Sequence, residues 1–457
     1  MTNPTNNSLS GAYRAVWRWH FYAGIFTLPV LMLLAFTGAL YLFKPEIEQM
    51  AYGHMSKVSG SGQWVAPDTW TKAAEASVSG RATSILVPER TDQAVQIKVR
   101  SAQGEHTVFV DPYTAIAQGS IKGGGLMDTV KGLHSLSIFG RPFNILVEIV
   151  AGWAIILVAT GLYLWWPRKR DVAVAVPRAS SLKRRPFWRD LHAVTGLYAG
   201  AVIAFLAVTG MPWSAVWGDR FMNVMRESGL GRPAAPPAAS PWSHAGDHDQ
   251  PAGTGWTMEG VVLRLPDNHD AHNHNDHMTA EMPAPRSALA MVLDAVDARG
   301  MARPYTVSIP SDPSLAYTVA HGAEHAQDAR SLYVDGRDGA VKADLKWDQF
   351  GVGAKAFEWG IAVHQGHQYG WINRIIMLAG CIAIWLLAIS GLVMWWKRRP
   401  KPRGMGAPYA PPGLKVRAAV LGIVLPLAII YPLTGLSLIV AITAERLMMG
   451  LARHRSK

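Results

Sequence analysis

Long apolar blocks alternate with long polar segments along the 457 residues of this chain. A helix needs about 20 apolar residues to cross a bilayer, and five blocks reach that length. No small-residue cleavage site follows Phe43, so the first block is expected to be retained. The pattern predicts a polytopic α-helical membrane protein with spans at residues 21–43, 134–166 (an interfacial segment and then the span), 191–213, 371–396 and 418–442, followed by a C-terminal tail at 443–457.

Basic residues are concentrated in the two short connections between spans, residues 167–190 and 397–417. The long segments 44–133 and 214–370 carry at least as many acidic as basic residues. Because Lys and Arg near span ends tend to stay in the cytoplasm, we expect an inner-membrane protein with residues 1–20 cytoplasmic and the long segments periplasmic. The net charge of +12 then reflects topology and does not indicate nucleic-acid binding.

Two histidine patterns recur in the two halves of the chain. In spans 1 and 3 a histidine is followed by glycine after four residues and by Thr-Gly after 17: His20, Gly24, Thr37 and Gly38, then His192, Gly196, Thr209 and Gly210. Before spans 2 and 4 a histidine stands 27 residues ahead of a glycine that follows Thr or Ser within the span: His134 with Thr160-Gly161, and His364 with Ser390-Gly391. Each half is therefore expected to be a helix, an outside domain and a helix. The fifth span repeats Thr434-Gly435, but Arg417 stands where the histidine would be.

The outside segments resemble each other, and each predicts a short helix followed by strands. We expect helices at Thr71–Ser79 and Ser287–Arg299, and strands at Ser84–Val87, Val95–Val99, Thr107–Asp111, Tyr305–Ile309, Ala316–Ala320 and Ser331–Asp335. The last strand of each set runs into Asp-Pro or Asp-Gly, which is typical of turns. The prediction is two small α+β periplasmic modules, the second interrupted by a disordered insertion rich in His and Asp at residues 233–285.

The four repeated histidines are candidate cofactor ligands. An ionisable group in an apolar span is functional by default, and equivalent positions of two related halves are expected to face each other. We predict two bis-histidine b-type haems, one held by His20 and His192 at the cytoplasmic face and one by His134 and His364 at the periplasmic face. The single cysteine, Cys381, excludes a Cys-x-x-Cys-His attachment, so haem would be held without covalent bonds.

Three other residues and two alternatives belong to the same prediction. Arg18 and Arg189 are candidate contacts for haem propionates, and as topology determinants they need no such role. His367 lies three residues after His364 and is a competing ligand if that stretch is helical. Pairing of the histidines along each half stays open, and so does a simple interfacial role in which each ring bonds to backbone or lipid headgroups.

The insertion carries a separate set of candidate metal ligands interleaved with aspartates. Its histidines are His244, His248, His269, His272, His274 and His277. Without a fixed ligand geometry such a tract would bind divalent metals weakly and with poor specificity. The alternative is a solvated insertion without a metal.

A repeated motif resembles the PepSY-associated transmembrane helix family. It consists of Leu133-His134, Gly140, Thr160-Gly161-Leu162 and Trp165-Trp166, recurs around His364, and accompanies outside modules that end in Val-Asp. The resemblance extends to about Arg403. It implies two PepSY-like modules and likeness to iron-regulated inner-membrane proteins and ferric-siderophore reductases that carry haem b. It further implies electron transfer to Fe(III) in a siderophore, which would release iron because hard oxygen ligands hold Fe(III) better than Fe(II).

Three functions are compatible with these features. The first is a haem-dependent membrane oxidoreductase that serves a ferric siderophore or another periplasmic electron acceptor. No Gly-x-Gly-x-x-Gly stretch follows a strand, so its donor would be a separate quinol, flavin or soluble reductase. The second is a membrane-anchored PepSY binding module that regulates a periplasmic partner, and the third is a metal-uptake accessory protein. The lipid bilayer surrounds the spans in all three, and none involves nucleic acid.

Overall fold

The computed structural model describes residues 4–166, 176–177, 181–231, 287–311, 315–398, 422, 425–426 and 428–454. The chain forms two compact units. The helical unit comprises Met1–Leu42, Val130–Phe221 and Val363–Lys457, and the sheet unit comprises Phe43–Thr129 and Met222–Ala362. Both segments of the sheet unit are therefore inserted between consecutive segments of the helical unit.

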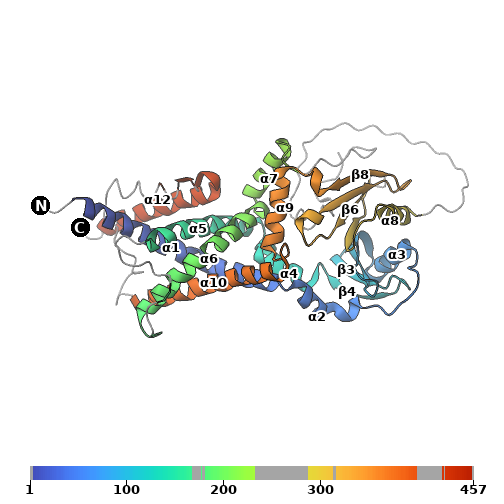
Figure 1. Cartoon of the computed structure of the whole chain (residues 1–457), viewed down its shortest axis with the longest axis horizontal. Coiled ribbons are helices and arrows are strands. Elements are labelled where there is room, and N and C mark those ends of the chain that lie inside the picture. Colours follow the sequence, from blue (N-terminus) through green and yellow to red (C-terminus); the bar gives the residue numbers. More distant parts are fainter. Residues whose placement is uncertain are drawn as a thin grey trace, which may run out of the picture. The chain divides into compact units, whose positions relative to one another are not determined.

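The helical unit is built on four long helices: α1 (Pro4–Tyr41), α5 (Arg141–Trp165), α6 (Arg185–Gly210) and α10 (Gly370–Arg398) (Figure 1). Within the described residues, these four are long and apolar enough to cross a membrane. Helices α5 and α6 each have a proline in the first turn, which favours a helix start at this point. Proline lacks a backbone N–H, and the N–H groups of the first turn have no partner within the helix, so nothing is lost. The first four predicted spans thus correspond to helices of spanning length.

The four helices form a closed ring. Helix α1 packs against α5 and α10, and α6 packs against the same two helices, so α1 and α6 lie on one diagonal. Helix α12 (Pro432–His454) packs on α5, where Trp153 Nε1 donates to Ser437 Oγ at 2.9 Å. Most of the first half of the predicted fifth span, 418–442, lies outside the described residues, and the apolar part of α12 is the shorter stretch Pro432–Thr443.

Shorter helices connect the two units along the chain. They are α2 (Lys44–Ser56), α4 (Gly125–His134), the 3-10 turn Ser137–Phe139, α7 (Trp217–Glu227) and α9 (Val352–His364). Helix α4 ends at His134 and α9 ends at His364, shortly before the long helices α5 and α10. Glu148 on α5 is buried and accepts from the backbone N–H groups of Val216 at 3.1 Å and Trp217 at 3.2 Å. This carboxylate satisfies donors at the start of α7.

The sheet unit contains one antiparallel sheet of eight strands in the order β4-β3-β2-β1-β5-β6-β7-β8. The strands are β1 (Gly80–Val87), β2 (Val95–Ser101), β3 (Gly104–Val110), β4 (Ala117–Lys122), β5 (Tyr305–Ser308), β6 (Tyr317–His321), β7 (Arg330–Val334) and β8 (Val341–Lys346). The two predicted modules are thus joined edge to edge, because β1 pairs with β5 in the centre and Ile85 lies opposite Val307.

Helices α3 (Pro67–Val78) and α8 (Ala288–Ala298) cover the apolar core of this sheet together. Ser287 caps α8 by accepting from the backbone N–H of Ala290 at 3.2 Å. The predicted Asp turns are confirmed: Asp111 Oδ1 accepts from the N–H of Tyr113 at 2.8 Å and Asp335 Oδ1 from that of Arg337 at 3.0 Å. The Arg337 guanidinium beside Asp335 holds the pKa of that carboxyl well below its usual range.

Candidate functional site

The structure brings the four repeated histidines together as two pairs across the halves. The ring centroids of His20 on α1 and His192 on α6 are 6.4 Å apart, and the ring planes are at 87°. The centroids of His134, at the end of α4, and His364, at the end of α9, are 6.5 Å apart with an interplanar angle of 89°. The geometry agrees with pairing across the halves and not along them.

The two pairs lie at opposite ends of the helix bundle. His20 stands near one end of the α1 span, and Thr37, which contacts His134, stands 17 residues further along the same helix. At 1.5 Å of rise per residue these positions are about 25 Å apart along the axis. The separation is close to the thickness of the hydrocarbon core of a bilayer.

Each histidine ring bonds through Nδ1 to a hydroxyl on a neighbouring helix. The Nδ1–Oγ distances are 2.8 Å for His20 with Thr160, 2.9 Å for His134 with Thr37, 3.0 Å for His192 with Ser390 and 2.7 Å for His364 with Thr209. The partners are the Thr or Ser of the repeated Thr-Gly and Ser-Gly pairs. For His20 and His192 the hydroxyl comes from the neighbouring helix of the ring, α5 or α10, and for His134 and His364, which end α4 and α9, it comes from α1 or α6.

The hydroxyl protons fix which ring nitrogen carries hydrogen. Thr160 donates to the carbonyl of Ile156 at 2.7 Å, and the other three hydroxyls donate to carbonyls four residues earlier at 2.6 to 2.7 Å. A hydroxyl has one proton, so toward each histidine it acts as acceptor and Nδ1 is the protonated nitrogen. Every hydrogen bond of the four rings within the described residues uses Nδ1, which leaves the Nε2 lone pair available in all four.

The glycine after each hydroxyl residue makes room for the ring. A Cβ added at Gly38 would lie 3.3 Å from His134 Cε1, and one at Gly161 would lie 3.4 Å from His20 Cε1. At Gly210 and Gly391 the corresponding distances to the Cε1 atoms of His364 and His192 are 3.8 Å. Each Thr-Gly or Ser-Gly dipeptide therefore has two separate functions: its Thr or Ser accepts from Nδ1, and its glycine allows the imidazole to lie against the helix.

The pair His134 and His364 is in the neutral state that ligates metals. Both residues precede the spans in sequence, and removal from water lowers the pKa of His134 to about 4. The same burial, with repulsion from His134, lowers the pKa of His364 to about 3. At neutral pH both rings are therefore uncharged, as metal coordination by imidazole requires.

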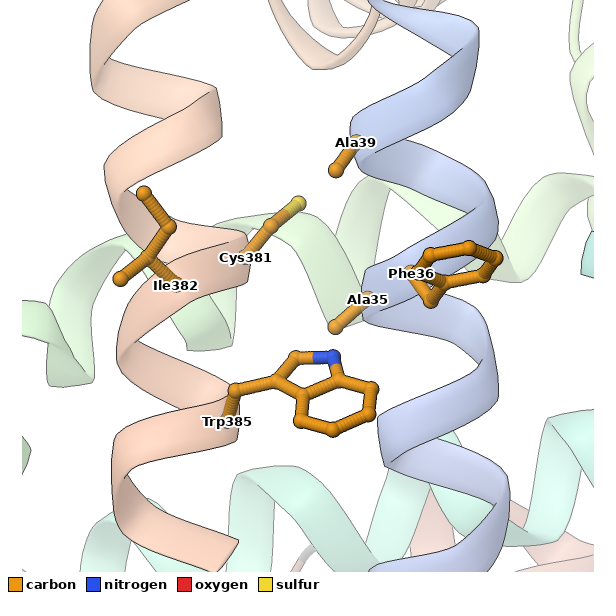
Figure 2. Close-up of a pocket in the computed structure, with 6 residues that line it drawn as sticks. All are labelled: Ala35, Phe36, Ala39, Cys381, Ile382 and Trp385. Atoms are coloured by element: carbon orange, nitrogen blue, oxygen red, sulfur yellow. The ribbon is translucent and has the colours of Figure 1, made fainter.

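An apolar cavity of about 340 Å³, open to the surface of the bundle, lies between α1 and α10 (Figure 2). It is lined by Ala35, Phe36, Ala39, Cys381, Ile382 and Trp385. Figure 2 shows the Trp385 indole and the Cys381 thiol directed from α10 toward α1. A Cβ added at Gly38 would lie 3.8 Å from Cys381 Sγ as well as against His134, so the cavity and the histidine pair are neighbours. A second cavity of about 330 Å³ shares Phe36 and Trp385 with the first.

A family model, that of the PepSY-associated TM region, matches residues 17–398. The chain belongs to this family. The match includes the four long helices, both histidine pairs and the eight-stranded sheet. A search of curated proteins finds no match to the chain.

Two arginines beside the histidines of this PepSY-associated membrane protein have protein partners of their own. Arg189 forms an ion pair with Asp190 at 2.7 Å, in which the Asp190 side chain is buried and that of Arg189 is exposed. Arg18 lies with its guanidinium carbon 5.4 Å from the ring centroid of Tyr22. The propionate role predicted for the two arginines stays a prediction.

The other sequence-predicted ligands are not brought into the pairs. Helix α9 ends at His364, so the helical condition under which His367 would share its face is not met. The six histidines of the insertion, from His244 to His277, lie outside the described residues. Within the part of the chain that is described, no group of three or more His, Cys, Asp or Glu residues is placed to hold a metal ion.

Sequence reasoning found the histidines of this family member but missed the role of the hydroxyls. Their signal was present as the repeated Thr-Gly and Ser-Gly pairs. A more specific clue is that the three Thr-Gly pairs and the Ser-Gly pair that contact the histidines each place a hydroxyl on an otherwise apolar helix. In the Thr434-Gly435 pair, Thr434 Oγ1 is buried without a hydrogen-bond partner among the described residues, and Gly152 packs against it.

Proposed function

We propose that this membrane protein is a di-haem b oxidoreductase of the inner membrane, which moves electrons across the bilayer to a periplasmic acceptor. The preferred acceptor is ferric iron held by a siderophore. One observation carries the proposal: two pairs of imidazoles at opposite ends of the bundle, each with Nδ1 occupied and Nε2 free. When bound, haem b supplies one-electron transfer between Fe(III) and Fe(II).

The spacing of the pairs fits a metal held between two imidazoles. A bond from a first-row metal to imidazole nitrogen is about 2 Å, so two bonds and half a ring on each side give about 6 Å between centroids. The observed separations are 6.4 and 6.5 Å. Direct bonding between the two rings of a pair is excluded, because both use Nδ1 to donate to a helix hydroxyl.

The surroundings fit a flat apolar macrocycle beside His134 and His364. The cavity between α1 and α10 has small side chains at Ala35 and Ala39 and aromatic walls at Phe36 and Trp385. Such an apolar lining would hold the edge of a porphyrin by contact area, without a covalent bond. The histidines would hold the iron, while the hydroxyls orient the rings through Nδ1 and keep them basic.

The position of the pairs supports transport of electrons over transport of metal. A separation of about 25 Å would put one pair near each face of the membrane. Basic connections that stay in the cytoplasm would put His20 and His192 inside and His134 and His364 outside. The outer pair would then deliver electrons on the side where ferric siderophores are met, and reduction would loosen oxygen ligands from the iron.

Spectra and vesicle assays test this function. Protein purified after expression with adequate haem supply should show a reducible b-type absorption and two haems per chain. In right-side-out vesicles loaded with a soluble reductant, it should produce Fe(II) outside from a ferric hydroxamate chelate, detected by a coloured Fe(II) chelator. Vesicles without the protein provide the background. Absence of the b-type absorption would refute the proposal, and haem without external Fe(II) would refute the acceptor.

Thr209→Val should alter one haem while preserving side-chain volume. Thr209 Oγ1 accepts from His364 Nδ1 at 2.7 Å, and valine would leave this N–H unpaired. Loss of such a partner typically weakens metal binding by about 10 to 100-fold and lowers ligand basicity. We expect faster loss of one haem on dilution and a higher midpoint potential for it, measured by redox titration.

Thr27→Val is the matched control. Thr27 is also a buried threonine of a long helix, but its hydroxyl donates only to helix carbonyls, at 2.9 Å to Ala23. Haem retention and both potentials should stay at their original values in this variant. Equal effects of the two substitutions would mean that the Thr209 hydroxyl has no role beyond packing.

A further inference from the structure

The bundle end that holds His20 and His192 is strongly basic. The described residues 11–20, 181–192 and 390–398 contain one acidic residue, Asp190. They contain eight basic residues: Arg14, Arg18, Lys183, Arg184, Arg185, Arg189, Lys397 and Arg398. We call these eight residues the basic end. All except Arg18 are exposed, so their charges lie on the surface of the helical unit.

Three segments of the chain converge to form the basic end. Lys397 Nζ donates to the carbonyl of Lys183 at 2.7 Å, which ties the end of α10 to the segment before α6. The guanidinium carbon of Arg398 lies 4.3 Å from the ring centroid of Trp17 on α1. Arg185 is close enough to Arg398 for repulsion between like charges. These contacts gather the cations around the helix ends that carry His20 and His192.

The positive charge of the basic end is larger than the acidic side chains of the same described segments can neutralise. Asp190 is the single acid of these segments, and it already pairs with Arg189. The positive-inside tendency explains why basic residues flank the spans. The exposed guanidinium groups of Arg185 and Arg398 lie at these joined helix ends and add to a concentrated positive surface. Guanidinium groups bind phosphate in a bidentate manner, and a cluster of them steers phosphate-bearing molecules.

We infer that the basic end is the docking surface for a phosphate-bearing flavin nucleotide that donates electrons to the His20–His192 site. The inference rests on the proposed function and identifies the chemical class of the separate electron donor that this function requires. The reduced flavin gives up two electrons and two protons and becomes oxidised. The electrons leave one at a time and finally reduce two Fe(III) acceptors to Fe(II), while the protons enter the water on the donor side.

Two flavins that differ only by a phosphate provide the kinetic test. Full-length holoprotein in phosphatidylcholine nanodiscs is mixed with reduced flavin mononucleotide or with reduced riboflavin, and reduction of the b-type absorption is followed by stopped flow. At low ionic strength the nucleotide should react about tenfold faster, as expected for electrostatic steering. High salt should remove this advantage, because a short Debye length screens exposed charges.

The double variant Arg185→Gln and Arg398→Gln should lose the advantage of the nucleotide and keep the rate with riboflavin. Arg141→Gln is the matched control, since Arg141 is an exposed arginine at the opposite end of the bundle and should leave both rates unchanged. Binding of oxidised flavin mononucleotide, followed by quenching of its fluorescence, gives a second measurement that needs no haem. Binding should weaken about tenfold in the double variant.

Several outcomes would overturn the inference. Equal rates with the two flavins at low salt would show that the phosphate is not recognised. A nucleotide advantage that persists in the double variant would place phosphate recognition elsewhere. No nucleotide binding in phosphatidylcholine or in phosphatidylglycerol nanodiscs would assign the charges to topology or lipid headgroups. Failure of the proposed function is seen separately, as absence of the b-type spectrum.

Discussion

Replacing His364 with alanine is expected to lower the haem content of the purified protein from two per chain to one. The remaining haem should be the one held by His20 and His192, about 25 Å away along the bundle. His134 would keep its bond to Thr37 but lose the ring whose centroid lies 6.5 Å from its own. Haem extraction with pyridine and protein quantification measure the ratio, and transfer to external Fe(III) should be lost.

His367→Ala distinguishes this expectation from its main competitor. His367 follows the end of α9 and lies outside the four-residue set of paired rings. Its substitution should retain both haems and the original redox titration. If His367→Ala loses a haem and His364→Ala does not, the assignment of the outer ligand is wrong. If neither loses a haem, the His134–His364 pair is not a haem site.

Val307→Asp is expected to unfold the sheet unit. Val307 on β5 is fully buried opposite Ile85 on β1, at the junction that joins the two four-stranded halves. A carboxylate at this buried position must either take up a proton or separate β1 from β5 to reach water. We therefore expect the free energy of unfolding to fall by about 4 kcal/mol or more. Limited proteolysis of the full chain should then cut within β1 or β5 at much lower protease concentration.

Thr306→Asp is the control for this substitution. Thr306 is the neighbouring residue on β5, its side chain is partly exposed, and it points to the opposite face of the strand. A carboxylate at this position can reach water, so stability should change by about 1 kcal/mol or less. Equal protease resistance of Val307→Asp and the original chain would argue against a single continuous sheet.

Much of the helical unit was predictable because apolar blocks of spanning length leave few alternatives. The histidine pattern also predicted the pairs, since equivalent positions of two similar halves tend to face each other. What the pattern could not give is the hydrogen-bond partner of each ring. Thr37 and His134 are 97 residues apart, and Ser390 and His192 are 198 apart, so only the folded chain identifies the hydroxyls as acceptors.

The sheet was predicted less completely, and the reasons are local. Strands β4 and β8 were missed because they are edge strands without a fully buried residue, and their sequences, AQGSIK and VKADLK, are too polar to signal a strand. The joining of β1 to β5 was also missed. Pairing between strands more than 200 residues apart depends on tertiary context and leaves no signal at either strand. The haem and the siderophore stay predictions that the experiments above address.

The central junction of the sheet has a consequence for any shortened form of the protein. A chain that ended after α5 would expose the entire hydrogen-bonding edge of β1, including the fully buried Ile85. It would also contain one imidazole of each pair, His20 and His134, without its partner. Such a half could satisfy both needs only by associating with a second half through a two-fold arrangement. In the full chain, β5 covers this edge of β1, and His192 and His364 supply the second imidazole of each pair.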